Sequence, residues 1–456
     1  MENFWDYSVW SSFNIVAVLL ISLLAGNMVK KAIKPLRASL IPTSVLAGIL
    51  LVIVASIYKA ITGNVMFDTA FFGGHGTQSL EVITYHALAL GFIAATFKPS
   101  KGKLTKKRTE EIFNTGVTTV STYLIQAILG LAISMIAMYF ISDFFVAAGI
   151  LLPFGYGQGT GQALNYGGIF ENDFGFVGGK SFGLTIAALG FISASIGGVI
   201  HLTYLKRKGL IKPQTEIVSA TKENVDTDNS MNESMDKLTV QVALIALAYM
   251  ITYAIMGLLG KLLPGMKSVV YGFNFLLGVL SATLVKAVIN LLKKKNIIKK
   301  EYVSDFLMTR TSNFFYDIMI VSGIAAIRFG ALENYWGVIL IMGVVGLVIT
   351  YVYNRIIAKV LFKEYVEEQF LVMYGMLTGT ASTGIILLRE IDGNFKTPAA
   401  DNIVYQNFPA IVFGFPLMLL ATLAPVKPVL TLIILIAFFL VMNVILFRSK
   451  IFKKKK

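Results

Sequence analysis

The sequence of 456 residues contains no cysteine and only three histidines. Without cysteine the chain has no disulfide bond, no thiolate metal site and no cysteine nucleophile. Three histidines cannot supply a metal cluster or a nucleophile–base pair, and the sequence has no P-loop, HExxH motif or nucleophile elbow. We therefore expect no enzyme, no ATP-driven machine and no cofactor.

Charged side chains are also scarce, because 14% of residues are charged whereas 56% are hydrophobic, and the mean hydropathy is +0.72. So few polar side chains cannot cover a soluble globule of this length, and lipid must cover it instead. A bilayer core requires about 20 mostly apolar residues per helix, and the chain holds many such runs. The composition predicts a multi-pass α-helical protein of the cytoplasmic membrane.

Lysine and arginine, which give the chain a formal net charge of +15, gather between apolar runs. Such clusters are typical of topology signals and not of a nucleic-acid surface. The clusters occupy residues 30–37, 98–108, 206–208, 293–300, 355–363 and 453–456, whereas the intervening loops carry little beyond Lys59, Lys261, Lys267 and Lys427. Because basic loops stay in the cytoplasm, we place the N-terminus outside and the C-terminus inside. The first ten residues lack lysine and arginine, so we expect the first helix to be retained.

Apolar runs between charged or Pro/Gly breaks predict eleven membrane-spanning helices in two sets. The first set lies near residues 10–28, 39–58, 79–97, 113–141 and 178–204. The second lies near 239–262, 268–292, 305–330, 334–361 and 399–424, with a final helix near 428–447. Residues 209–237 are polar and aperiodic, which indicates a flexible cytoplasmic linker. We therefore divide the chain into an N-terminal half (1–208), the linker (209–237), a C-terminal half (238–424), and an additional helix with a basic tail (425–456).

Two segments, residues 147–168 and 370–388, are too rich in glycine and polar residues for a simple span. Each lies between the fourth and fifth helix of its half, and the orientation above has them enter the membrane from opposite sides. The third helices also align without gaps over residues 85–95 and 316–326, with Tyr85/Tyr316, Ile93/Ile324, Ala94/Ala325 and Ala95/Ala326 identical. The sequence thus predicts an all-α fold of two inverted-topology repeats of five helices, each with a Gly-rich re-entrant loop, plus one extra C-terminal helix.

Paired, interrupted segments in inverted repeats point to the binding site of a secondary transporter. Non-helical backbone persists at membrane depth only where protein or a watery cavity satisfies its polar groups. The candidate residues are Gly157, Gln158, Gly159, Thr160, Gly161, Gln162 and Asn165 in the first loop, and Thr378, Gly379, Thr380, Ser382 and Thr383 in the second. Glycine-rich turns expose carbonyl oxygens that suit a hard cation such as sodium, and broken-helix N-termini favour a carboxylate. The alternative is that these small residues serve only close helix packing.

Aligning residues 158–161 with 378–381 places Thr160 opposite Thr380, and we assign these two side chains to a Na+ site. Asp317 lies well inside a predicted helix, where a carboxylate is a functional hypothesis because it is costly there. Asp317 could bind an ammonium group, sodium or a proton, or form a structural pair with Arg310 or Arg328. His86, its counterpart in the first half, could relay protons or serve as a structural hydrogen-bonding group.

The motif Gly157-Gln158-Gly159-Thr160-Gly161, followed by a helix with the pair Gly197-Gly198, resembles the bacterial sodium/glutamate symporter family. The stretch YVEEQFLVMYGMLTGTASTG (365–384) is similar to the second Gly-rich segment of that family, and the resemblance covers residues 11–424. It implies ten core helices in two inverted halves, a homodimer, and sodium-coupled uptake of an acidic amino acid by an elevator mechanism. The chain differs from the family in Gln158, where histidine is usual, in its Thr/Ser-rich second loop, and in the eleventh helix.

The leading hypothesis is therefore a symporter of Na+ with glutamate or a related small carboxylate in the lipid bilayer. An alternative transporter couples protons through Asp317 and His86. A channel is a third hypothesis, because pores also place polar backbone at membrane depth. We expect no nucleic-acid partner.

Overall fold

The computed structural model describes residues 3–97, 105–210, 235–297, 302–393 and 396–451, and within these ranges it contains helices and no strands. Nine described helices are long and apolar enough to cross a membrane, or ten if one bent pair counts as a single span. Large apolar side chains such as Leu24, Met250 and Val344 are more than 60% exposed. Apolar surface of this extent requires lipid around it. The prediction of an all-helical, multi-pass membrane protein is thus confirmed at this level.

Helices occur in all eleven predicted segments. The first set contains α1 (Tyr7–Ala32), α3 (Thr43–Thr62), α4 (Gly76–Phe97), α5 (Lys106–Ala137) and α8 (Gly179–Arg207). The second contains α9 (Lys237–Leu262), α11 (Asn274–Lys294), α12 (Asp305–Ala325), α13 (Trp336–Leu361), α16 (Ala399–Tyr405) with α17 (Asn407–Leu423), and α18 (Pro428–Leu446). Most of the linker, residues 211–234, and the basic tail from residue 452 lie outside the described ranges.

Two predicted spans differ in detail from the observed helices. The segment near 399–424 is not one helix, because α16 and α17 meet at an angle of 52° beside Gln406. Pro409 in the first turn of α17 has no N–H to continue the helical ladder across this point. The span predicted at 305–330 ends at Ala325, and α12, which carries Asp305, Arg310 and Asp317, is not among the nine described helices that are long and apolar enough to cross a membrane.

Each Gly-rich segment forms two α-helices around a break, and the first also begins with a short 3-10 helix. The first consists of η3 (Ala148–Ile150), α6 (Leu151–Tyr156) and α7 (Gly159–Phe174), and the second of α14 (Val366–Thr378) and α15 (Ala381–Arg389). In the first, the rings of Phe154 and Tyr166 stack 3.9 Å apart across the break. In the second, a Cβ atom built on Gly375 would lie 2.8 Å from the Cα atom of Gly384. Both segments therefore fold back on themselves as helical hairpins.

The chain divides into two compact units that do not follow the two sequence halves. Unit 1 comprises Met1–Val82, Leu104–Lys212 and Ile320–Lys456, and unit 2 comprises Ile83–Lys103 and Pro213–Met319. Unit 2 has its own core, in which Phe97, Ala248, Ala282 and Met308 of four different helices are buried. Both Gly-rich hairpins belong to unit 1, so every candidate residue except Asp317 and His86 lies in that unit. The inverted repeat itself stays a prediction.

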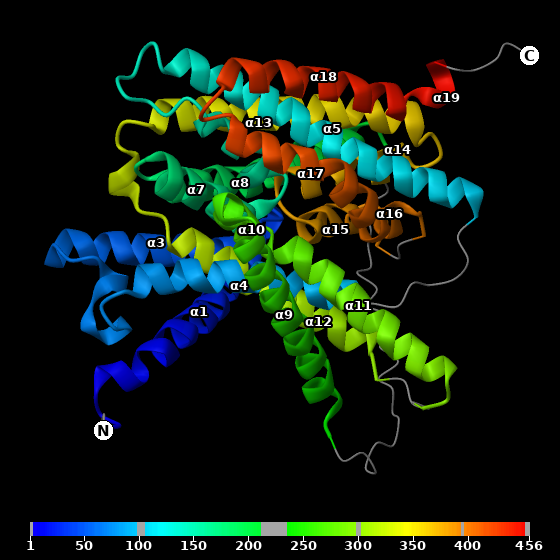
Figure 1. Ribbon diagram of the computed structural model, residues 1–456. Helices are drawn as coiled ribbons and strands as arrows, with labels where there is room; N and C mark the ends of the chain where they lie inside the picture. Colours follow the sequence, from blue (N-terminus) through cyan, green and yellow to red (C-terminus); the bar gives the residue numbers. More distant parts are fainter. Residues whose placement is uncertain (1–2, 98–104, 211–234, 298–301, 394–395, 452–456) are drawn as a thin grey trace, which may run out of the picture. The chain divides into compact units, whose positions relative to one another are not determined.

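Unit 1 is built around α5, α8 and α13. α8 packs against α6, α7, α13 and α14, and the additional helix α18 runs beside α5 (Figure 1). The Tyr353 hydroxyl donates a hydrogen bond of 2.8 Å to Asn443 Oδ1 of α18, and Arg448 just beyond α18 donates one of 2.9 Å to Asn114 Oδ1 of α5. The eleventh helix is thus an integral part of unit 1.

The tightest approach in unit 1 joins α5 to the start of the first hairpin. A Cβ atom built on Gly149 would lie 1.7 Å from the Gly130 carbonyl oxygen, and backbone atoms cannot move aside as a side chain can. We expect Gly149→Ala to destabilise the protein by about 1–3 kcal/mol, the usual cost of overpacking. The midpoint of thermal unfolding in detergent measures this. Gly337→Ala is the control, because a Cβ atom built there would have no described atom within 4 Å beyond its chain neighbours and the adjacent backbone of its own helix. Equal midpoints for both variants would contradict the packing.

Candidate functional site

The first break lies between α6 and α7, at Gly157 and Gln158. α7 begins at Gly159, whose φ of +78° is readily adopted only by glycine. Gln158 occupies the N-cap position of α7 but makes no capping hydrogen bond with its side chain in the described structure. The chain therefore reverses through glycine, and the first turn of α7 has no capping side chain at its N-cap.

The second break lies between α14 and α15, at Gly379 and Thr380. Thr380 is the N-cap of α15, and its hydroxyl accepts a hydrogen bond of 3.4 Å from the Thr383 backbone N–H. The hydroxyl oxygens of Thr380 and Thr383 are 3.3 Å apart. The second break thus presents two neighbouring hydroxyls at a helix N-terminus, which fits the Thr/Ser-rich sequence there.

Helix α5 contacts both breaks through two side chains that lie one turn apart. The Tyr123 hydroxyl donates a hydrogen bond of 3.1 Å to the Gly157 carbonyl oxygen at the first break. The Gln126 amide donates one of 3.0 Å to the Leu377 carbonyl oxygen beside the second. Since residues three positions apart share one face of a helix, the two breaks lie close together on that face of α5.

Helix α8 contacts the same two breaks. A Cβ atom built on Gly190 would lie 2.5 Å from the Thr378 carbonyl oxygen and 3.2 Å from the Tyr156 ring. The Tyr156 hydroxyl lies 2.8 Å from Ser193 Oγ, and the Tyr374 hydroxyl donates a hydrogen bond of 2.7 Å to the Ser193 carbonyl oxygen. Both hairpins therefore pack on one stretch of α8, and the breaks from the two sequence halves form one buried region of unit 1, which we call the break site.

The residues predicted from the first loop lie on α7 and around its start. Thr160, Gly161 and Gln162 are buried, whereas Gln158 and Asn165 are partly exposed. A Cβ atom built on Gly323, in the last part of α12, would lie 2.8 Å from Thr160 Cβ, so glycine at this position leaves room for the Thr160 side chain.

Gln162 is 1% exposed, and neither its side-chain oxygen nor its nitrogen has a hydrogen-bond partner in the described structure. Leaving such a group unpaired in a protein interior costs about 1–3 kcal/mol. A ligand at the first turn of α7 would offset this cost. Gln162 is therefore the candidate residue with the most direct evidence for a missing partner.

The residues predicted from the second loop differ in exposure. Thr378 and Thr383 are buried, whereas Thr380 and Ser382 are partly exposed. The Thr378 hydroxyl donates a hydrogen bond of 2.7 Å to the Tyr374 carbonyl oxygen of its own helix. The Thr378 carbonyl oxygen, and not its hydroxyl, is thus the group that reaches the junction of α6 and α8.

The two other candidates belong to unit 2. Asp317 is exposed on α12. His86 Nδ1 lies 2.6 Å from the Tyr249 hydroxyl, and its ring packs edge-on against Tyr85 and Tyr249. These contacts of His86 are those of a structural hydrogen-bonding group. A role of His86 in proton relay stays a prediction.

A buried polar cluster near the start of α14 was not predicted from the sequence. His201 of α8 is 1% exposed; its Nε2 lies 2.8 Å from Glu367 Oε2 and its Nδ1 2.8 Å from the Tyr351 hydroxyl. Arg355 donates two hydrogen bonds, of 2.7 and 2.6 Å, to the same Glu367 carboxylate. We call these four residues the His201 cluster. It joins α14 to α8 and α13, and no short motif signals it because His201 is 150 residues from Tyr351 and 166 residues from Glu367 in the chain.

The Arg355 and Glu367 pair of the His201 cluster should contribute measurably to stability, because both side chains are mostly buried and hydrogen-bonded twice. We expect a double-mutant cycle of Arg355→Met and Glu367→Gln to give a coupling of about 1–2 kcal/mol, as for other residues in one ion-pair network. Thermal unfolding of the four proteins in detergent measures it.

The exposed pair Lys107 and Glu364, 62% and 72% exposed, is the matched control, and Lys107→Met with Glu364→Gln should show no coupling. Independent, additive effects of the Arg355 and Glu367 substitutions would show that the cluster does not anchor α14.

Comparison of the chain with known protein families, with curated proteins and with solved structures gave no match.

Proposed function

We propose that this protein is a secondary active transporter that carries Na+ and glutamate, or a related small carboxylate, through the break site by alternating access. The observation that carries the proposal is that two broken hairpins, one from each half of the chain, are held together by Tyr123 and Gln126 of α5. Interrupted helices meeting in a buried polar region are typical of the ion and substrate sites of secondary transporters.

The chemistry of the break site suits both proposed ligands. The carbonyl oxygens of Gly157 and Thr378 and the hydroxyls of Thr160 and Thr380 are hard oxygen donors of the kind that sodium prefers. The N-termini of α7 and α15 direct backbone N–H groups and positive dipole ends toward the breaks, which favours a carboxylate without a buried arginine. Gln162 can donate to a carboxylate oxygen through its unpaired amide.

The resemblance to sodium/glutamate symporters supplies the remaining parts of the proposal. These are a homodimer and an elevator-type movement. The outside N-terminus and the cytoplasmic C-terminus of the proposal follow instead from the clusters of lysine and arginine between the apolar runs. The division of the chain into two compact units supplies two bodies, which a mechanism of this type requires.

Uptake of labelled glutamate into proteoliposomes, with and without an inward sodium gradient at fixed pH and membrane potential, tests the proposal. We expect sodium-dependent accumulation, and a reduction of at least about tenfold in Thr160→Ala and Thr380→Ala, because each removes a ligand of a bound cation. Thr203→Ala is the control, since Thr203 is exposed and, among the described residues, its hydroxyl bonds only within α8.

The other outcomes separate the alternatives. Accumulation of another carboxylate in place of glutamate would support the same mechanism with a different substrate. Accumulation driven by a pH gradient, independent of sodium and lost in Asp317→Asn, favours proton coupling. Rapid flux without accumulation favours a channel.

Gln162 gives a sharper test, because ligand binding and stability should respond in opposite ways. Gln162→Leu removes an unpaired buried amide, so the ligand-free protein should be as stable as the wild type or more so. The apparent affinity for substrate should fall by about tenfold, the equivalent of one hydrogen bond of about 1.4 kcal/mol. Uptake kinetics and thermal unfolding measure the two effects.

Gln126→Leu is the matched control for Gln162→Leu. The Gln126 amide already bonds to Thr350 Oγ1 and to the Leu377 carbonyl oxygen, so its loss should lower stability. An unchanged apparent affinity of Gln162→Leu for substrate would show that the Gln162 side chain does not contact the substrate.

A further inference from the structure

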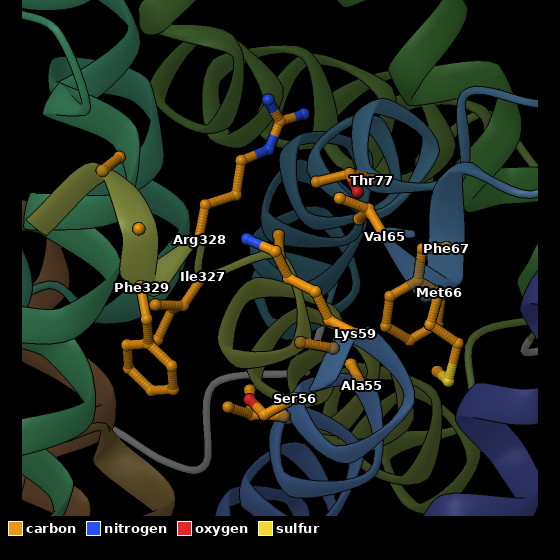
Figure 2. Close-up of a pocket in the computed structure, with 15 residues that line it drawn as sticks. Ala55, Ser56, Lys59, Val65, Met66, Phe67, Thr77, Ile327, Arg328 and Phe329 are labelled. Carbon is orange, nitrogen blue, oxygen red and sulfur yellow. The ribbon is translucent and has the colours of Figure 1, made fainter. Parts of the chain in front are cut away.

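A separate pocket of about 310 Å³ lies in unit 1 where α3 ends. It is formed by the end of α3, the turn that follows it, the start of α4 and the segment 325–331, which includes η5 (Phe329–Leu332) (Figure 2). None of the residues of the break site lines it. The pocket is therefore distinct from the break site and has its own set of residues.

The charged residues that line the pocket are Lys59 and Arg328, and no acidic residue among those that the structure describes lines it. Figure 2 shows both side chains extending into the same space from opposite walls. Lys59 Nζ lies 3.8 Å from a Cβ atom built on Gly330, which places the ammonium group against η5. In the described structure neither side chain forms an ion pair or a side-chain hydrogen bond. Two such cations facing one pocket favour an anion between them.

The remaining walls are largely apolar. Val52, Phe67, Ala325 and Ile327 line the pocket, and the main polar side chains besides the two cations are Ser56 and Thr77. Ligand sites typically begin at about 300 Å³, so this volume accommodates an anionic group together with a few carbon atoms. A purely inorganic anion would leave the apolar walls without a partner. The pocket thus suits an anionic group attached to an apolar body.

The position of the pocket identifies the source of such a ligand. Lys59 lies in the last turn of α3, a helix long and apolar enough to span a membrane. The end of a spanning helix lies at the depth of lipid headgroups. Arginine presents a planar set of donors that fits phosphate oxygens, and lysine adds a point charge.

We propose that this pocket binds the headgroup of an anionic phospholipid, with Lys59 and Arg328 holding the phosphate and the apolar walls holding the adjoining glycerol and acyl carbons. The bound lipid joins the end of α3 to the loop containing η5. That loop also contacts the start of α8, because the Arg328 backbone N–H donates a hydrogen bond of 3.0 Å to Ser181 Oγ. A ligand that binds only the folded protein stabilises it, so the lipid stabilises unit 1.

Native mass spectrometry of the full-length protein in neutral detergent, with added phosphatidylglycerol or phosphatidylcholine, tests the proposal. We expect the wild type to retain phosphatidylglycerol in preference to phosphatidylcholine. Lys59→Gln and Arg328→Gln should each lower this retention about fivefold, as expected for one basic residue at a membrane surface. Lys261→Gln should retain the lipid like the wild type, because Lys261 also lies in the last turn of an apolar helix, α9, but lines no part of this pocket.

Thermal unfolding in the same detergent provides a second readout. Phosphatidylglycerol should raise the unfolding midpoint of the wild type and of Lys59→Arg, which keeps the charge, but not of the double Gln variant. Equal lipid retention by the wild type and the double variant would overturn the proposal. Stabilisation by the soluble anion butyl phosphate, lost in the double Gln variant and with no preference for phosphatidylglycerol, would also overturn it and assign the pocket to a soluble organic anion.

Discussion

Unit 1 depends on one constraint: backbone that leaves the helical ladder in a protein interior must find its hydrogen-bond partners in neighbouring helices. The two breaks meet this constraint in the same way. α5 supplies a hydroxyl from Tyr123 and an amide from Gln126 to carbonyl oxygens at or beside the breaks, and Gly190 of α8 leaves room for the Thr378 carbonyl oxygen. Because the same two helices satisfy both breaks, a shift of either hairpin alters the surroundings of the other.

The helices were predictable because lipid imposes a length and an apolar composition on any segment that crosses it. The prediction for α9, near 239–262, agrees with Lys237–Leu262, and that for α13, near 334–361, agrees with Trp336–Leu361. Hydropathy does not report where the backbone leaves the helix. The bend at Gln406 was therefore missed, although Pro409, three residues later, is a signal that could have located it.

The break site was predictable in part, because glycine and polar residues inside an apolar region mark the interruptions in the sequence. Their neighbours were not predictable from local patterns. Gln126 is 251 residues from Leu377, and His201 is 166 residues from Glu367. One glutamine or histidine within a long apolar helix is more often structural than functional, and only the fold shows which carbonyl or carboxylate it meets. The compact units, which combine both halves of the chain, were unpredictable for the same reason.

The two proposed anion sites differ in the physical origin of their attraction, and this difference separates them in solution. The break site is buried and uses helix ends, carbonyl oxygens and the neutral amide of Gln162, so dissolved salt screens it little. Lys59 and Arg328 are exposed, and their full charges are screened strongly at the ionic strength of a cell. Raising the concentration of a non-transported salt should therefore weaken lipid binding at the pocket before it weakens carboxylate binding at the breaks, which allows the two sites to be studied independently in one preparation.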